Sequence, residues 1–106
     1  MLFRSIENQI VISKNRSKIP ENDLKWTASK IAAIELGYSL HSSAVFNNGN
    51  ADVKEVMSFL EICFNIDLGD YYRAYITIKN RKKDRTIFLN ELIESLIRKM
   101  NKDDIE

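Results

Sequence analysis

The sequence of 106 residues predicts a mainly α-helical domain, a bundle of four to five helices that contains a helix-turn-helix. Three segments, roughly 23–42, 52–65 and 89–101, carry apolar residues at spacings of three and four, which is the period of an amphipathic helix. A short turn at 67–70, which contains Gly69, follows the second segment. Two helices joined by such a turn form a helix-turn-helix, provided that the chain after the turn is helical.

The first helix is expected to begin at Asp23 or Thr27, since either side chain can cap it, and to end near Ser42. Gly37 lies inside this helix and costs about 1 kcal/mol relative to alanine. Close packing against a neighbouring element would explain a glycine at this position. The apolar face of the helix is formed by Ile31, Ile34 and Tyr38.

A break at residues 47–50, with the sequence Asn-Asn-Gly-Asn, separates the first helix from the second. Asn50 or Asp52 can cap the second helix, and Glu55 lies near the unpaired amides of its first turn. The helix is expected to end near Asn65. Its apolar stripe consists of Val53, Val56, Leu60, and Cys63 with Phe64.

Residues 70–88 allow two structures. The first is a helix over about 70–80, which the residues themselves slightly favour. The second is a small basic β-hairpin, because residues 74–78 alternate in polarity and are rich in β-formers, and residues 85–88 could pair with them. In the helix, the inward side chains would be Tyr71 or Tyr72, Tyr75 and Ile78.

The two ends of the chain flank one domain, expected over 23–102. Residues 1–22 form an N-terminal segment and linker, the first half of which fits either a helix or a short strand. The last helix, over about 89–101, is followed by an acidic tail at 103–106. The apolar residues of this helix are Leu89, Leu92, Ile93, Leu96 and Met100.

Composition argues for a binding module and against an enzyme. With 44% hydrophobic and 29% charged residues, the chain resembles a globular protein, and it holds no apolar run long enough for a membrane span and no secretory signal. The single cysteine, Cys63, excludes an internal disulfide and a multi-cysteine zinc site, and the single histidine, His41, excludes any mechanism that needs two histidines. We therefore expect a cytoplasmic protein with no catalytic residues, metal, cofactor, membrane partner or small-molecule substrate.

The net charge of +1 conceals a strongly uneven distribution. Residues 1–34 carry +3, residues 35–70 carry −5, residues 71–102 carry +6, and residues 103–106 carry −3. Five of the seven residues at 79–85 are basic. A dense basic run of this kind is commonly a solvated loop, but next to the expected helix-turn-helix it also fits a surface that meets an anionic partner.

Double-stranded DNA is the partner that this arrangement favours. The second helix of a helix-turn-helix enters the major groove, where Arg73, Thr77 and Asn80 would approach base edges. Lys54 and the basic run would neutralise phosphates, since arginine and lysine bind them readily. The candidate DNA-binding residues are Lys54, Tyr71, Arg73, Thr77, Lys79, Asn80, Arg81, Lys82, Lys83, Arg85 and Thr86.

A second function is compatible with the same residues. The chain could be a protein–protein interaction or dimerisation module of a regulatory complex, binding itself or a second regulator without direct DNA contact. The low net charge keeps this alternative open, because dedicated DNA-binding domains are commonly more basic.

Five stretches of the chain resemble the RteC family. They are residues 24–30 (LKWTASK), 47–49 (NNG), 64–73 (FNIDLGDYYR), 81–86 (RKKDRT) and 88–89 (FL). The third stretch is long enough to be fairly specific.

RteC-type proteins regulate bacterial conjugative transposons; they are associated with tetracycline-resistance elements and activate excision and transfer. Their C-terminal part is described as a winged-helix DNA-binding domain that follows a separate helical domain. The resemblance covers about residues 24–100, and it implies that this chain corresponds to that C-terminal part, as a fragment of a longer regulator or as a short relative. A winged helix would favour the β-hairpin over 74–88, as the wing.

Overall fold

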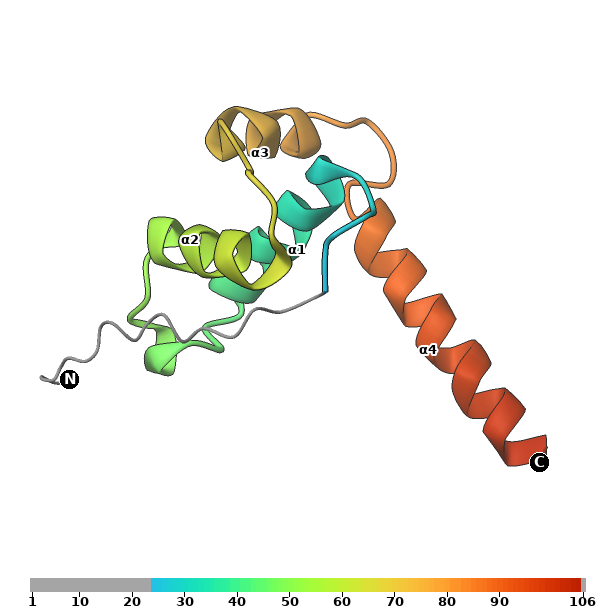
Figure 1. Ribbon diagram of the computed structural model, residues 1–106. Coiled ribbons are helices and arrows are strands. Elements are labelled where there is room, and N and C mark those ends of the chain that lie inside the picture. The colour runs from blue at the N-terminus through green and yellow to red at the C-terminus, as the bar shows by residue number, and fades with distance from the viewer. Residues whose placement is uncertain (1–23, 106) are drawn as a thin grey trace, which may run out of the picture.

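The computed structural model describes residues 24–105, and in this range it shows four α-helices (Figure 1). One turn of 3-10 helix, η2 (Asn47–Gly49), lies between the first two. The first helix, α1 (Lys30–Ser42), is central and packs against each of the other three, while most of the last helix, α4 (Ile87–Ile105), projects away from the other helices. The mainly α-helical prediction is confirmed, and the interpretation of residues 1–22 lies outside the described residues. The helices are α1 (Lys30–Ser42), α2 (Val53–Phe64), α3 (Tyr71–Lys79) and α4 (Ile87–Ile105).

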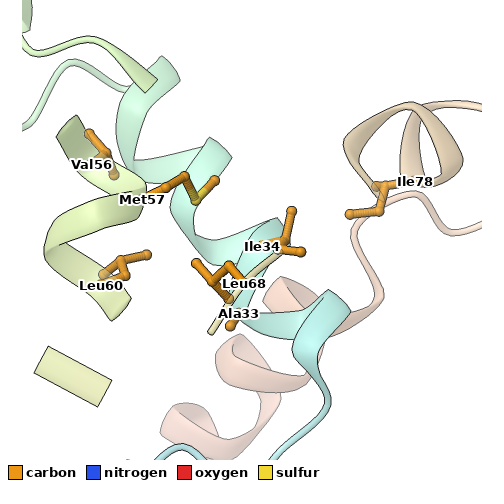
Figure 2. Close-up of a cluster of buried hydrophobic side chains, with 7 residues drawn as sticks. All are labelled: Ala33, Ile34, Val56, Met57, Leu60, Leu68 and Ile78. Carbon is orange, nitrogen blue, oxygen red and sulfur yellow. The ribbon is translucent and has the colours of Figure 1, made fainter. Parts of the chain in front are cut away.

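The hydrophobic core lies between α1, α2, α3 and the residues that lead into α3 (Figure 2). Gly37 of α1 faces α2, where a Cβ atom would lie only 2.7 Å from Met57 Cε and 3.0 Å from Leu60 Cδ1. The expected close packing at this glycine is therefore confirmed. The buried core residues are Ala33, Ile34, Val56, Met57, Leu60, Leu68 and Ile78.

Helix α1 begins later than its sequence suggests. Its N-cap is Ser29, whose hydroxyl accepts a hydrogen bond from the Ala32 amide at 3.1 Å, so the prediction of Thr27 as the cap is wrong. The reason is Trp26, whose ring stacks on Phe64 and meets Phe88 edge-on. This packing holds the residues before Ser29 in a non-helical path across the ends of α2 and α4.

Helix α2 agrees with the prediction at both ends. Asp52 and Glu55 form a capping box, in which each side chain accepts a hydrogen bond from the other residue's amide. Asn65 ends the helix in the left-handed conformation, with φ 54°. Asparagine tolerates this conformation better than most residues, which explains the sharp stop.

Residues 70–88 contain no strand, so the β-hairpin wing implied by the winged-helix resemblance is wrong for this chain. Residues 71–79 form α3, and a loop over 80–86 leads into α4. Asp70 caps α3 through the Arg73 amide, and Ile78 of this helix is buried in the core. Residues 74–78, which prefer strands by composition, are therefore helical here because tertiary packing outweighs that preference.

Helix α4 is longer than predicted and includes Asp103 and Asp104, two of the residues assigned to an acidic tail. Lys99 Nζ lies 3.1 Å from Asp103 Oδ2, one turn further along, and this pair supports the last turn. Among the described residues, no helix is long and apolar enough to cross a membrane.

Candidate nucleic-acid interface

The outer face of α3 carries a row of three exposed polar side chains, Arg73, Thr77 and Asn80. Their spacing of four and three places them on one side of the helix. The opposite side turns Ile78 into the core, so the packing of α3 on α1 decides which side faces solvent. The three residues expected to approach base edges are therefore exposed on the same face.

Arg73 is the most prominent member of this row, with a side chain that is 85% exposed. Its Nε atom lies 3.7 Å from Asp70 Oδ2, and an ion pair this exposed holds the arginine only weakly. The Thr77 hydroxyl donates to the Arg73 carbonyl at 3.2 Å, within the same helix. The guanidinium group can therefore exchange Asp70 for another anion at little cost.

The two tyrosines at the start of α3 have different environments. Tyr71 is half-buried and packs against Tyr38 of α1, at 6.5 Å between ring centroids, whereas Tyr72 is 63% exposed. Tyr38 also stacks on Tyr75 at 4.2 Å. Burial of Tyr38 raises the pKa of its hydroxyl above the ordinary value, and the neighbouring tyrosines add to this shift. Tyr71 thus belongs to the packing between α1 and α3, and Tyr72 is the tyrosine open to a partner.

The loop over 80–86 and the end of α3 carry four exposed cationic side chains and one acidic residue, Asp84. Arg85 Nη1 lies 3.4 Å from the Lys79 carbonyl oxygen, which ties the end of the loop back to α3. Lys79, Arg85 and Thr86 also line a cavity of about 600 Å³ between α1, α3 and the start of α4. The exposed cations are Lys79, Lys82, Lys83 and Arg85.

Arg81 differs from its basic neighbours because it points inward. Its side chain is only 22% exposed, and Nη1 lies 3.6 Å from Oε1 of the buried Glu35. That nitrogen is buried without a hydrogen-bond partner. The predicted role of Arg81 at a phosphate is thus replaced by an ion pair that fixes the loop against α1.

Glu35 is the residue that sequence reasoning missed. Its second oxygen, Oε2, accepts a hydrogen bond from the Leu89 amide at 2.9 Å, at the N-terminus of α4. One buried carboxylate therefore holds both the basic loop and the following helix. A signal was present: Glu35 lies four residues after Ile31, in the apolar face of its helix, where an acidic residue needs a partner.

Lys54 is exposed in the first turn of α2 and belongs to a different helix from the other candidates. The remaining exposed candidates follow one another from α3 into the loop. We call this continuous surface the α3–loop surface. It consists of Tyr72 and the exposed candidates Arg73, Thr77, Lys79, Asn80, Lys82, Lys83, Arg85 and Thr86.

Comparison with protein families matches the chain to the family described as RteC protein, over residues 2–104. The chain belongs to the RteC family. The match extends beyond the five stretches noted in the sequence, in both directions. Neither the search of curated proteins nor the search of solved structures gave a match.

Membership of the RteC family indicates a regulatory role connected with conjugative transposons. In this RteC-family chain, residues of four of the five stretches have clear structural tasks, since Phe88 of the last stretch packs against Trp26 of the first. Trp26 joins α2 to α4, Asp70 caps α3, and Arg81 pairs with Glu35. These stretches therefore include residues that hold the helices together, as well as exposed ones.

Proposed function

We propose that this chain is a DNA-binding module of an RteC-type transcriptional regulator, with α3 as the recognition helix of a helix-turn-helix. The observation that carries the proposal is the α3–loop surface, in which a row of exposed polar side chains continues directly into four exposed cations. Arg73, Thr77 and Asn80 would read base edges from the major groove. Activation of excision and transfer genes of a mobile element is the corresponding regulatory role.

The loop cations supply the sequence-independent part of binding. Lys82 and Lys83 are exposed, and neither is in an ion pair among the described residues. Each lysine that neutralises a phosphate releases counterions, so the logarithm of the binding constant falls by about 0.9 per contact for each logarithmic unit of salt. Arg81 is excluded from this set because its charge is directed at Glu35.

The test is a salt titration of binding to random duplex DNA, followed by fluorescence anisotropy. We expect micromolar binding that collapses between about 50 and 200 mM salt. The Lys82→Ala/Lys83→Ala variant should flatten the salt slope by about 2. The matched control is Arg98→Ala/Lys102→Ala, which removes the same charge from exposed positions on α4 and should leave the slope unchanged.

A second candidate function has its own observation. The apolar face of α4 is exposed, and exposed apolar patches are typical of protein interaction sites. A module that binds a partner regulator without touching DNA would present such a face. The same titration separates the two functions. Absence of binding even at low salt would contradict DNA binding and leave the interaction module.

A further inference from the structure

Helix α4 presents an apolar face that no other described element covers. The helix packs on α1 only near its N-terminus and then projects into solvent (Figure 1). None of its residues is buried. Five consecutive members of its apolar face are between 41% and 56% exposed: Leu92, Ile93, Leu96, Ile97 and Met100.

The sequence of α4 fits a heptad repeat. Leu89 and Leu96 take position d, and Ile93 and Met100 take position a, so the seam of the helix is apolar from Leu89 to Met100 and ends before Asp103, the next position d. From residue 91 to residue 102, every b, c and f position is polar. These outward positions are Glu91, Glu94, Ser95, Arg98, Asn101 and Lys102.

The flanking positions are complementary to a second copy of the same helix. In a parallel pair, position g of one helix meets position e of the next heptad in the other. Leu92 would therefore meet Ile97 of the second copy, and Lys99 would meet Asp104 of the second copy. One apolar contact and one pair of opposite charges result on each side of the seam.

The body of the protein leaves this seam open. Phe88, which packs against Trp26, takes position c, on the side of α4 away from the seam. Leu89 is partly covered and borders the cavity, so the free seam begins at Leu92. Two copies can thus approach along α4 without displacing the contact of Phe88 with Trp26.

We propose that α4 forms a parallel, two-stranded coiled coil with α4 of a second copy of this chain. Isoleucine at position a with leucine at position d favours this oligomeric state. The seam is shorter than the three to four heptads typical of stable coiled coils, so the dimer is expected to dissociate at concentrations on the order of micromolar.

The coiled-coil dimer adds to the proposed function, and only its role on DNA rests on that function. Both bodies lie at the N-terminal end of the pair, so the two α3–loop surfaces would be available to two half-sites of one DNA duplex. The dimer itself needs no DNA. Its failure and the failure of DNA binding are therefore separate results.

The test measures the mass of the full chain in solution, by sedimentation equilibrium from low micromolar to near-millimolar concentrations. The wild-type chain should approach twice the monomer mass. Leu96→Glu places a charge in the seam and should give a monomer, whereas Ser95→Glu places the same charge at the neighbouring outward position and should remain dimeric. Because Leu96 is exposed in the single chain, circular dichroism should show the same helix content for both variants at concentrations where both are monomeric.

A disulfide experiment tests the parallel direction. With Cys63→Ala as background, Met100→Cys should give a disulfide-linked dimer under mild oxidation, because residues at position a face each other across a parallel seam. Asn101→Cys is the matched control and should not cross-link. In an antiparallel pair, residue 100 would not meet its own copy, and the absence of cross-linking would overturn the parallel arrangement.

Two results would overturn the dimer. The first is a wild-type chain that stays monomeric at every concentration. If, in such a monomer, the α4 amides exchange slowly only when residues 1–23 are present, the apolar face would be assigned to this segment. The second is equal dimerisation of Leu96→Glu and Ser95→Glu, which would place the interface elsewhere.

Discussion

The carboxylate of Glu35, in the middle of α1, accepts a hydrogen bond from the backbone amide of Leu89, 54 residues further along the chain. The bond satisfies an unpaired amide at the start of α4 with a side chain from another helix. The same carboxylate pairs with Arg81. The orientation of α4 and the position of the basic loop therefore depend on one buried acidic group.

Glu35→Ala should lower the free energy of unfolding by about 1–3 kcal/mol, because the Leu89 amide and the Arg81 guanidinium group both lose a partner. Glu35→Gln retains an oxygen for the Leu89 amide and should lose less. Urea unfolding of the two variants, followed by circular dichroism, measures the difference. Equal stability of both variants and the wild type would mean that the bond makes no net contribution.

Arg81→Ala should separate stability from DNA binding. Because Arg81 faces the buried Glu35, its removal should lower the free energy of unfolding by about 1–3 kcal/mol, while the salt slope of DNA binding stays unchanged. The Lys82→Ala/Lys83→Ala variant should behave in the opposite way, with unchanged unfolding and a flatter slope. A reduced slope in Arg81→Ala would show that this arginine leaves Glu35 to contact phosphate.

Gly37→Ala should destabilise the protein despite the higher helix propensity of alanine. The added Cβ would meet Met57 and Leu60 at 3.0 Å or less, and overpacking of this kind costs about 1–3 kcal/mol. About 1 kcal/mol is regained from helix propensity. We expect a net loss of about 1 kcal/mol in urea unfolding. A more stable Gly37→Ala variant would mean that the Met57 side chain moves aside without cost.

The raised pKa of Tyr38 predicts a loss of stability at alkaline pH. The fold favours the neutral hydroxyl, so this contribution is complete below pH 10.0 and is lost as pH rises from 10.0 toward the higher pKa of the folded state. Tyr38→Phe should therefore lose less stability than the wild type between about pH 9 and pH 11. Tyr72→Phe changes an exposed tyrosine, removes only one of the smaller causes of the shift and should keep most of the wild-type loss. An identical pH profile for all three proteins would contradict the prediction.

Arg73→Ala should reduce discrimination between DNA sequences more than overall affinity. A bidentate contact with a base is worth about 1–3 kcal/mol of discrimination, whereas a phosphate contact contributes equally to all sequences. Competition by unrelated duplexes against a selected binding sequence measures this ratio. Uniform weakening across sequences would reassign Arg73 to the phosphate backbone.

Local signals in the sequence were sufficient for both ends of α2, and the cap of α3 is equally local once that segment is helical. The capping box of Asp52 with Glu55, the left-handed Asn65 and the cap by Asp70 each depend on residues within a few positions of one another. The tight packing at Gly37 could also be anticipated, because glycine inside a helix requires a reason. Amphipathic spacing correctly gave the existence of α1, α2 and α4.

Tertiary structure decided what local preference left open. Residues 74–78 favour a strand by composition, yet they form a helix from which Ile78 enters the core and Tyr75 stacks on Tyr38. The start of α1 moved to Ser29 because Trp26 packs on side chains of two other helices. Arg81 is not one of the exposed cations, because it pairs with the buried carboxylate of Glu35, 46 residues earlier in the chain. The sequence by itself determined the existence of α1, α2 and α4 and the caps of α2, whose interactions span a few residues. The direction in which each charged side chain points depends on contacts between distant segments, which only the packed structure contains.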